Sequence, residues 1–246
     1  MQYPIRKSLL PLVLCVSLLA VWSALAAPPS PAANAVAPAI DPDLQRELES
    51  LAEKSAEIRD LTARFEQRRF TPLLKRPLVS TGRIWFKEGR MRWETDKPHP
   101  SVTVVDSGDL RVYYPQHRKL EIYRIEGSIG ELARGPTLKP QVLLKYFHIE
   151  RLPAEPSDGR CVVQLTPLEK STREQLRRIV VHLDHESGLI RQLDWTDSDG
   201  ERTYITLTEM NANAGVTDEE LELRVPPGTK TVRPLGPGSS RGGAPR

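Results

Sequence analysis

"TGRIWFKEGRMRWET", residues 81–95, combines two tryptophans, a phenylalanine and a methionine with several charged side chains. The pattern predicts a two-stranded hairpin in which residues 84–86 run out, residues 87–89 turn and residues 91–93 return. Successive side chains of a strand point to opposite faces, so the charged residues gather on one face of this hairpin. The apolar face then carries Ile84, Phe86, Met91 and Trp93. That face is either part of an ordinary core or the wall of an apolar pocket.

Further alternating segments extend from Leu61 almost to the end of the chain. Turn signals at 106–109, 115–118 and 197–200 separate them, which is typical of an antiparallel meander. Counting them predicts roughly ten to eleven strands. Beyond the hairpin, the alternating segments are 102–104, 110–114, 120–122, 161–165, 179–183, 193–195, 203–207 and 221–225.

Two parts of the sequence show a helical period instead. Apolar residues recur every three or four positions from Leu44 to Ile58, which predicts an opening helix. Residues 127–152 predict two short helices around Pro136 and Pro140. A large antiparallel sheet with one apolar face curls, and that face has to be covered. We therefore predict an α+β fold, mainly antiparallel β, in which helices cover the mouth of an incomplete, half-open barrel.

The two ends of the chain differ in composition from the part between them. Residues 1–26 have basic residues, an apolar run and a small-x-small signal, Ala24–Ala26, which predicts a cleaved secretory signal peptide. Residues 27–42 are rich in Pro and Ala, and residues 234–246 are rich in Gly and Pro, so we expect a disordered leader and a disordered tail. One domain, residues 43–233, lies between them.

Charge and cysteine content exclude several classes of protein. Cleavage leaves 246 − 26 = 220 residues and removes Arg6 and Lys7, which lowers the net charge from +3 to +1. A chain so close to neutrality gives no support for a nucleic-acid partner or a polybasic membrane patch. Cys161 is then the only cysteine, so no intramolecular disulfide is expected. The fold must rest on its hydrophobic core.

Catalytic and metal-binding motifs are weak. His182 and Asp184 share one face of a predicted strand, but the apolar residues between them predict that this is the polar outer face. "DSDGE", residues 197–201, lacks the spacing of a calcium loop and predicts a hairpin turn at Asp199–Gly200. No nucleophile elbow, phosphate loop or cysteine–metal cluster occurs in the sequence. We expect no catalytic residue, metal or cofactor.

Four stretches in order resemble the LolA family of periplasmic lipoprotein carriers. They are "LTARFEQ" at 61–67, "GRIWFKEGRMRWET" with the following Pro98, "VVDSGDLRVYYP" at 104–115, and the strand order from "LTP" at 165–167 to the Pro-x-Gly near 226–228. The likeness covers about residues 45–233. It implies an incomplete barrel closed by helices and a carrier that is not an enzyme.

The resemblance also implies partners and a location. Such a carrier works in the periplasm, where it accepts the acylated end of a lipoprotein from an inner-membrane ABC transporter and passes it to an outer-membrane acceptor lipoprotein. The family commonly has Arg-Pro where this chain has Lys87-Glu88, and that arginine is associated with holding the helical lid shut. Lysine keeps the charge but not the planar fork of donors, so Lys87 is either a looser lid latch or a solvated turn residue.

On this interpretation the apolar face of the hairpin is a lipid-binding wall. Aromatic rings and flexible methionines tolerate cargo of variable shape. The predicted lipid-binding residues are Phe65, Ile84, Phe86, Met91, Trp93, Val104, Val112, Tyr114 and Leu120 in the wall, with Leu143, Leu144 and Phe147 in the lid. The alternative for each is that it packs in a core that has no cavity.

Three other functions stay open on the sequence. The chain could shuttle another acylated lipid or glycolipid, act as an enzyme on acyl or cell-wall substrates, or serve as an envelope-stress sensor with the same apolar concavity. The enzyme would need an inward-facing polar group, and the sensor would need a membrane tether. A shuttle presents its mouth to two partners in turn, so we expect a monomer.

Overall fold

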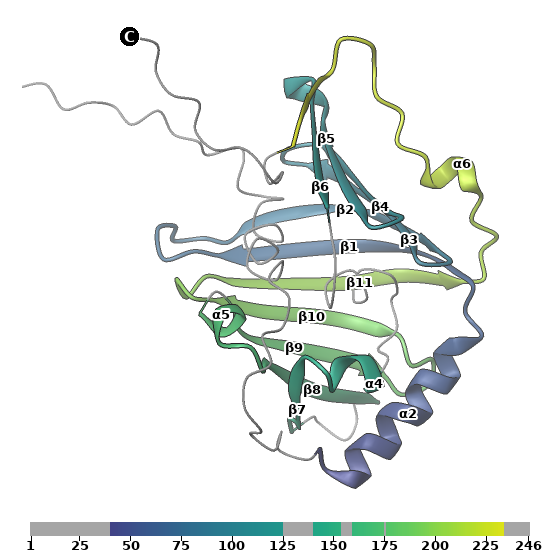
Figure 1. Cartoon of the computed structure of the whole chain (residues 1–246), viewed down its shortest axis with the longest axis vertical. Helices are drawn as coiled ribbons and strands as arrows, with labels where there is room; N and C mark the ends of the chain where they lie inside the picture. The colour runs from purple at the N-terminus through teal and green to yellow at the C-terminus, as the bar shows by residue number, and fades with distance from the viewer. Residues whose placement is uncertain (1–39, 125–139, 154–158, 175, 234–246) are drawn as a thin grey trace, which may run out of the picture.

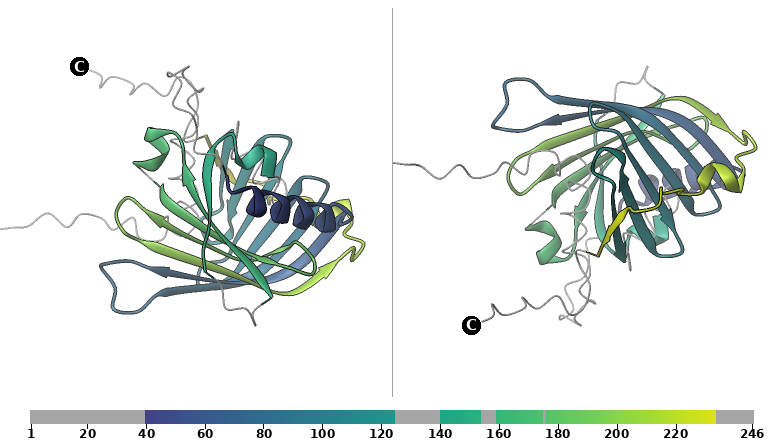
Figure 2. Two further views of the ribbon diagram at one scale, coloured as in Figure 1. Left: turned by 90° about the horizontal axis from the view of Figure 1, so that it is seen from below. Right: turned by 90° about the horizontal axis from the view of Figure 1, so that it is seen from above.

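One twelve-stranded sheet organises the chain in a computed structural model, which describes residues 40–124, 140–153, 159–174 and 176–233. The strand order is β12-β6-β5-β4-β3-β2-β1-β11-β10-β9-β8-β7, and neighbours are antiparallel except for the parallel pair β12 and β6. Within the described residues β12 and β7 form the two edges, so the sheet curls without closing (Figures 1 and 2). The predicted half-open, mainly antiparallel architecture is confirmed. The predicted ten to eleven strands are too few.

The first half of the sheet is a meander of hairpins. It consists of β1 (Asp60–Phe70), β2 (Leu78–Lys87), β3 (Arg90–Lys97), β4 (Ser101–Asp106), β5 (Asp109–Tyr114) and β6 (Lys119–Arg124), with a 3-10 turn, η2 (Pro115–His117), before β6. Lys87 pairs with Arg90, so Glu88 and Gly89 alone make the predicted turn. Both have positive φ, 49° and 77°, as a two-residue turn of this hand requires.

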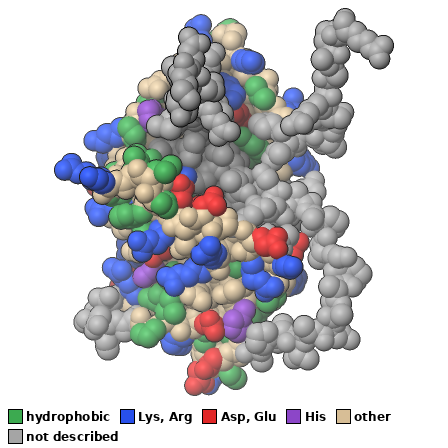
Figure 3. All heavy atoms as spheres, turned by 90° about the vertical axis from the view of Figure 1, so that its left-hand side faces the viewer, with side chains coloured by type: hydrophobic (Ala, Val, Ile, Leu, Met, Phe, Trp, Pro, Cys, Tyr) green, Lys and Arg blue, Asp and Glu red, His purple; other side chains and the backbone are tan. Residues whose placement is uncertain are grey.

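The second half begins after residues 125–139, which lie outside the described residues together with the first predicted short helix. It contains α4 (Pro140–Leu143), β7 (Phe147–Arg151), β8 (Arg160–Pro167), α5 (Lys170–Arg173), β9 (Leu176–Asp184), β10 (Ile190–Asp197) and β11 (Arg202–Ala212). β11 returns to pair with β1, which joins the two halves (Figure 1). The hairpin of β1 and β2 extends past its neighbours at the end of the sheet that faces the viewer in Figure 3.

The C-terminal segment differs from the sequence prediction at one expected strand. Residues 221–225 do not form a strand: α6 (Asp218–Leu221) ends there, and the last strand is β12 (Lys230–Val232). The reason is local, because Thr217 and Glu220 form a reciprocal capping box that satisfies the amides of a helical turn. The alternation of Leu221 and Val225 is therefore not a sheet pattern.

The opening helix, α2 (Pro42–Ala56), lies against the inner, concave face of the sheet (Figure 2). Asp41 caps it by accepting hydrogen bonds from the amides of Asp43 (2.7 Å) and Leu44 (3.3 Å), and Pro42 occupies a position suited to a first turn. Its buried leucines, spaced as the sequence predicts, join one core cluster with side chains of β7, β8 and β9. The helix therefore covers the second half of the sheet.

Glu47 fixes this helix to the strands below it. Its carboxylate pairs with Arg151 of β7 and lies 3.3 Å from Nε2 of His185. Burial by itself would raise the pKa of Glu47, but the hydrogen bonds and charges of these partners and of Cys161 outweigh it, so the pKa lies below its ordinary value. Burial, with the charge of Glu47, raises the pKa of Cys161 to about 12. The thiol is therefore a packed, protonated group.

Candidate functional site: the apolar inner face

The apolar face of the hairpin 81–95 lies on the inner side of the sheet. In an antiparallel ladder, residues directly opposite one another point to the same face. One row crosses the first half of the sheet from β1 to β6 and is almost entirely apolar: Leu61, Phe86, Met91, Val105, Leu110 and Tyr123. The next row is Ala63, Ile84, Trp93, Thr103, Val112 and Glu121. The predicted sharing of a face by Ile84, Phe86, Met91 and Trp93 is confirmed.

Phe65 and Trp93 form the aromatic centre of this face. Their ring centroids are 4.2 Å apart and the ring planes are inclined by 41°. Gly82 permits this contact, because a Cβ at this position would overlap the carbonyl oxygen of Glu94 and lie 2.7 Å from the ring of Phe65. Phe65 belongs to the same core cluster as Trp195 of β10, so this cluster connects the two halves of the sheet.

Met91 lies where three apolar clusters meet. It is only partly buried, and it packs against the cluster of β4–β6, the cluster around Phe65 and the cluster around Phe86. Trp93 is likewise partly buried. An unbranched thioether at such a junction adapts to neighbours of different shape. Within the described residues, the inner face is thus continuous across the hairpin and not divided into separate cores.

Two predicted wall residues lie on the other face of the sheet. Val104 is opposite Arg92 and Arg111, whereas Leu120 is opposite Tyr113 and Thr231. Both are buried, but on the outer side, so neither lines the inner wall. In "SVTVVD" a valine points inward whether the odd-numbered or the even-numbered residues face the inner side. Only the pairing of β4 with β3 shows that Val105, opposite Met91, is the inward one. Val112 and Tyr114 do lie on the inner face.

Glu121 occupies the inner position that Leu120 was expected to fill. Its side chain is 2% exposed, accepts hydrogen bonds from the hydroxyls of Tyr123 (2.7 Å) and Tyr114 (3.3 Å), and lies 2.6 Å from Nζ of Lys119. A single Glu between Leu and Ile looks like a solvent-facing residue, so sequence reasoning missed it. Glu121 therefore places a buried charged group beside the apolar surface of the first half of the inner face.

The predicted lid residues belong partly to the core. Leu143 is the last residue of α4, and both it and Phe147 are buried in the cluster under α2, with Leu144 packed against it. Phe147 is not helical: it begins β7 and pairs with Pro167. Helix α4 is only one turn long, because Phe147 and Ile149 bury their side chains by joining β8. The rest of the predicted lid lies in residues 125–139, outside the described residues.

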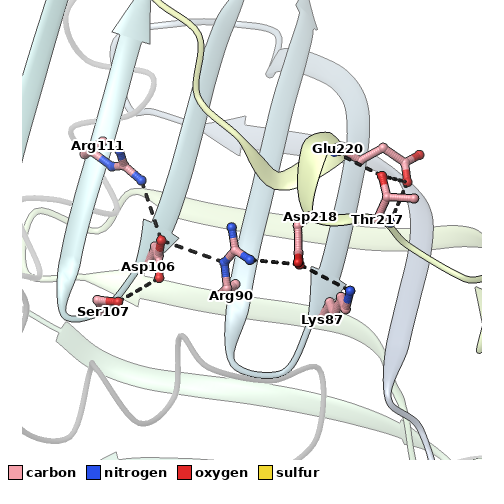
Figure 4. A network of polar contacts seen from close by, with 8 residues as sticks. All are labelled: Lys87, Arg90, Asp106, Ser107, Arg111, Thr217, Asp218 and Glu220. Atoms are coloured by element: carbon pink, nitrogen blue, oxygen red, sulfur yellow. Dashed lines mark hydrogen bonds and ion pairs between the residues drawn. The ribbon is translucent and has the colours of Figure 1, made fainter.

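Lys87 contacts the C-terminal segment, in a network that Figure 4 shows. Its Nζ lies 3.2 Å from Oδ1 of Asp218 in α6, and Nη1 of Arg90 donates to the same oxygen at 3.0 Å. The hydrogen bond from Lys87, its charge and that of Arg90 hold the pKa of Asp218 below its ordinary value. Arg90 also lies 3.7 Å from Asp106, which extends the network to the turn after β4. The predicted contact of Lys87 with a helical lid stays a prediction.

The polar groups that were weighed as catalytic or metal-binding separate into different contacts. Nε2 of His182 lies 3.4 Å from Oδ2 of Asp194, whereas Asp184 accepts hydrogen bonds from Ser187 and Arg191. Among the described residues no group of three or more His, Cys, Asp or Glu side chains is placed to hold a metal ion. "DSDGE" forms the predicted turn, with the Asp197 carboxylate accepting from the amides of Asp199 and Glu201.

None of the helices within the described residues is long and apolar enough to cross a membrane.

Comparison with known proteins gives matches over most of the chain. The family model described as "Outer membrane lipoprotein carrier protein LolA" matches residues 56–223. An outer-membrane lipoprotein carrier protein of Pseudomonas syringae pv. tomato is 25% identical over 192 residues, covering 76% of this chain and 86% of that protein. That of Dechloromonas aromatica is 25% identical over 175 residues, covering 71% and 81%. The structure of a LolA superfamily protein from Nitrosomonas europaea has 14% identity and a TM-score of 0.40, covering 72% of this chain and 97% of that one.

Proposed function

This chain belongs to the LolA family of outer-membrane lipoprotein carrier proteins, and on that premise we propose that it carries lipoproteins across the periplasm with their acyl chains on the inner face of its sheet. Members of this family bind and transport, so the chain is a carrier and not an enzyme. The observation that carries the proposal is the continuous apolar row from Leu61 to Tyr123 on this face. Met91 in that row and Trp93 in the next row are only partly buried.

The energetics of acyl chains explain why such a surface is needed. Burial of each CH₂ group is worth about 0.8 kcal/mol, so three chains of about fifteen methylenes represent on the order of 30 kcal/mol in transfer from water. An exposed triacyl anchor would therefore not cross an aqueous compartment unassisted. The carrier supplies the apolar surface, and a separate energy-coupled transporter has to supply the free energy for extraction from the membrane.

The relay that the family resemblance implies has two partners besides the cargo. An inner-membrane ABC transporter would load the carrier, and an outer-membrane acceptor lipoprotein would unload it. The predicted signal peptide, residues 1–26, would export the chain to the periplasm. A monomer fits this role because one mouth has to meet both partners. Lys87 would act as a latch only if it also reaches the predicted lid.

One observation favours a second cargo, another acylated lipid or a glycolipid. Glu121, Tyr114 and Tyr123 place hydrogen-bonding groups beside the apolar surface of the inner face. A sugar or another polar head group would find partners there, whereas plain acyl chains would not.

The test is native mass spectrometry of the protein purified from its own periplasm without detergent, followed by identification of what it releases. We expect an acylated lipoprotein bound to the wild type. Trp93→Gln, on the inner face, should lower the bound fraction. Trp85→Gln is the matched control, because Trp85 lies on the same hairpin, is also partly buried and faces outward opposite Arg92. Equal loss in both variants would contradict binding on the inner face, and a bound glycolipid would select the second cargo.

A further inference from the structure

The free end of the hairpin formed by β1 and β2, residues 70–79, is unusually apolar for a surface. Leu73 is 90% exposed and Leu74 is 48% exposed, and Phe70, Leu78 and Val79 are exposed as well. In the described part of the chain, these are all of the exposed large apolar side chains except Val225. We call residues 70–79 the hairpin tip. Its apolar side chains lie together at one end of the molecule, where an exposed apolar patch marks an interaction surface.

The tip is held outward by its own structure. Thr71 and Pro72 begin a turn in which the amide of Leu74 donates to the carbonyl of Thr71 at 3.1 Å, and the amide of Leu73 donates to the Thr71 hydroxyl at 3.3 Å. At the base, Phe70 packs edge-on against Tyr204, with ring centroids 5.5 Å apart. These contacts place Leu73 at the apex of a turn. Its exposure is therefore a feature of the fold.

The charged side chains within the hairpin tip are both basic, Lys75 and Arg76. The sequence contains no Asp or Glu between Gln67 and Lys87, whereas Arg68, Arg69, Lys75 and Arg76 are all basic. Arg68 pairs with Glu66 and Arg69 with Glu201, but Lys75 and Arg76 are exposed beside the two leucines. Figure 3, which looks onto this end of the sheet, shows apolar side chains interspersed with Lys and Arg, with a few Asp and Glu side chains beside them. An anionic surface with an apolar interior complements this arrangement.

We propose that the hairpin tip docks on the surface of a bilayer that contains anionic phospholipid, with Leu73 and Leu74 entering the interface and Lys75 and Arg76 meeting the head groups. A narrow, protruding turn suits insertion into a fluid interface, whereas a protein partner would need a broader surface to bury a comparable area. The docking is reversible, because two leucines and two cations give only a modest affinity. It does not depend on which cargo the inner face carries.

The test is co-sedimentation of the exported protein with phosphatidylethanolamine vesicles that contain phosphatidylglycerol. We expect binding that weakens with added salt and is absent from phosphatidylcholine vesicles. The double variant Leu73→Gln with Leu74→Gln should weaken binding about tenfold. Lys75→Gln with Arg76→Gln should weaken it by a similar factor of about ten. Val225→Gln is the matched control, since it removes an exposed apolar side chain elsewhere and should leave binding unchanged.

Insertion of the hairpin tip into the bilayer can be measured directly. An environment-sensitive dye attached at Leu73→Cys should shift to the blue on vesicles and be quenched by brominated acyl chains. Absence of binding by the wild type, or equal weakening by Val225→Gln, would overturn the proposal. Cross-linking of the tip to an envelope protein without vesicle binding would also overturn it and assign the tip to a protein partner. Bound cargo, measured separately by native mass spectrometry, should be the same in all these variants.

Discussion

The ion pair between Lys119 and Glu121 leads to a sharp prediction, because its two partners differ in burial. The Glu121 side chain is 2% exposed and that of Lys119 is 24% exposed, and Nζ lies 2.6 Å from Oε1. Replacing Lys119 by Met leaves a carboxylate on the inner face that keeps the hydrogen bonds from the two tyrosine hydroxyls but loses its ion pair with Lys119. Replacing Glu121 by Gln leaves an ammonium group that already reaches water.

These differences set the order of the two effects. Removing one partner of a buried ion pair costs about 3–5 kcal/mol when the remaining charge is buried. Loss of a hydrogen bond to a charged group costs about 1.5–3 kcal/mol, and the remaining lysine can hydrate. We therefore expect Lys119→Met to lower the free energy of unfolding by about 3–5 kcal/mol and Glu121→Gln by about half of that. The larger loss is a substantial part of a typical total stability of about 5–15 kcal/mol.

The assay is urea unfolding followed by tryptophan fluorescence, with circular dichroism to establish that each variant is folded in the absence of urea. Lys145→Met is the matched control, because Lys145 is exposed and the change should have little effect. If Lys119→Met costs less than about 1 kcal/mol, or less than Glu121→Gln, then Glu121 is better solvated than the structure indicates. Glu121 would then not be a buried charge, and the second cargo would lose its supporting observation.

Three further predictions concern the groups that hold the fold together. The pKa of Glu47 is lowered in the folded state, so its contribution to stability is fully present above the unfolded-state pKa near 4.5 and is lost as the pH falls through the folded-state pKa. The free energy of unfolding of Glu47→Gln should therefore fall less steeply at acid pH than that of the wild type. Gly82→Ala should lower the melting temperature far more than Thr81→Ala, since its Cβ overlaps the carbonyl oxygen of Glu94 and no flexible side chain can give way. Cys161, buried and with a pKa of about 12, should react with a thiol reagent at pH 8 only after urea is added, and rapid labelling of the folded protein would contradict its packing.

The local sequence pattern predicted the structure correctly where burial of one apolar face allows only one arrangement. The alternation around the Glu88–Gly89 turn predicted the faces of both strands, because a two-residue turn leaves a single register. The leucine spacing after Asp41 predicted α2 for a similar reason, since one apolar stripe has to be buried.

The local sequence pattern did not predict the structure where two different arrangements would bury the same side chains. Phe147 is apolar enough for a lid helix or for a strand, and only the neighbouring β8 made it a strand. Leu221 and Val225 alternate as in a strand, yet the capping box between Thr217 and Glu220 forms a helical turn. Lys87 was predicted to lie in the turn, yet it is the last residue of β2, and its contact with Asp218 spans more than a hundred residues of sequence.

The sequence by itself determined the class of fold, the apolar face of the hairpin and the likeness to lipoprotein carriers, because each of these depends on the order and period of residues along the chain. The tertiary structure alone decided which phase of β4 and β6 faces inward, and so placed Glu121 on the inner face and Val104 outside it. It also decided that Leu73 stands exposed at the hairpin tip. A side chain's face depends on the register with a partner strand and its exposure on what packs over it, and neither is a property of the local sequence.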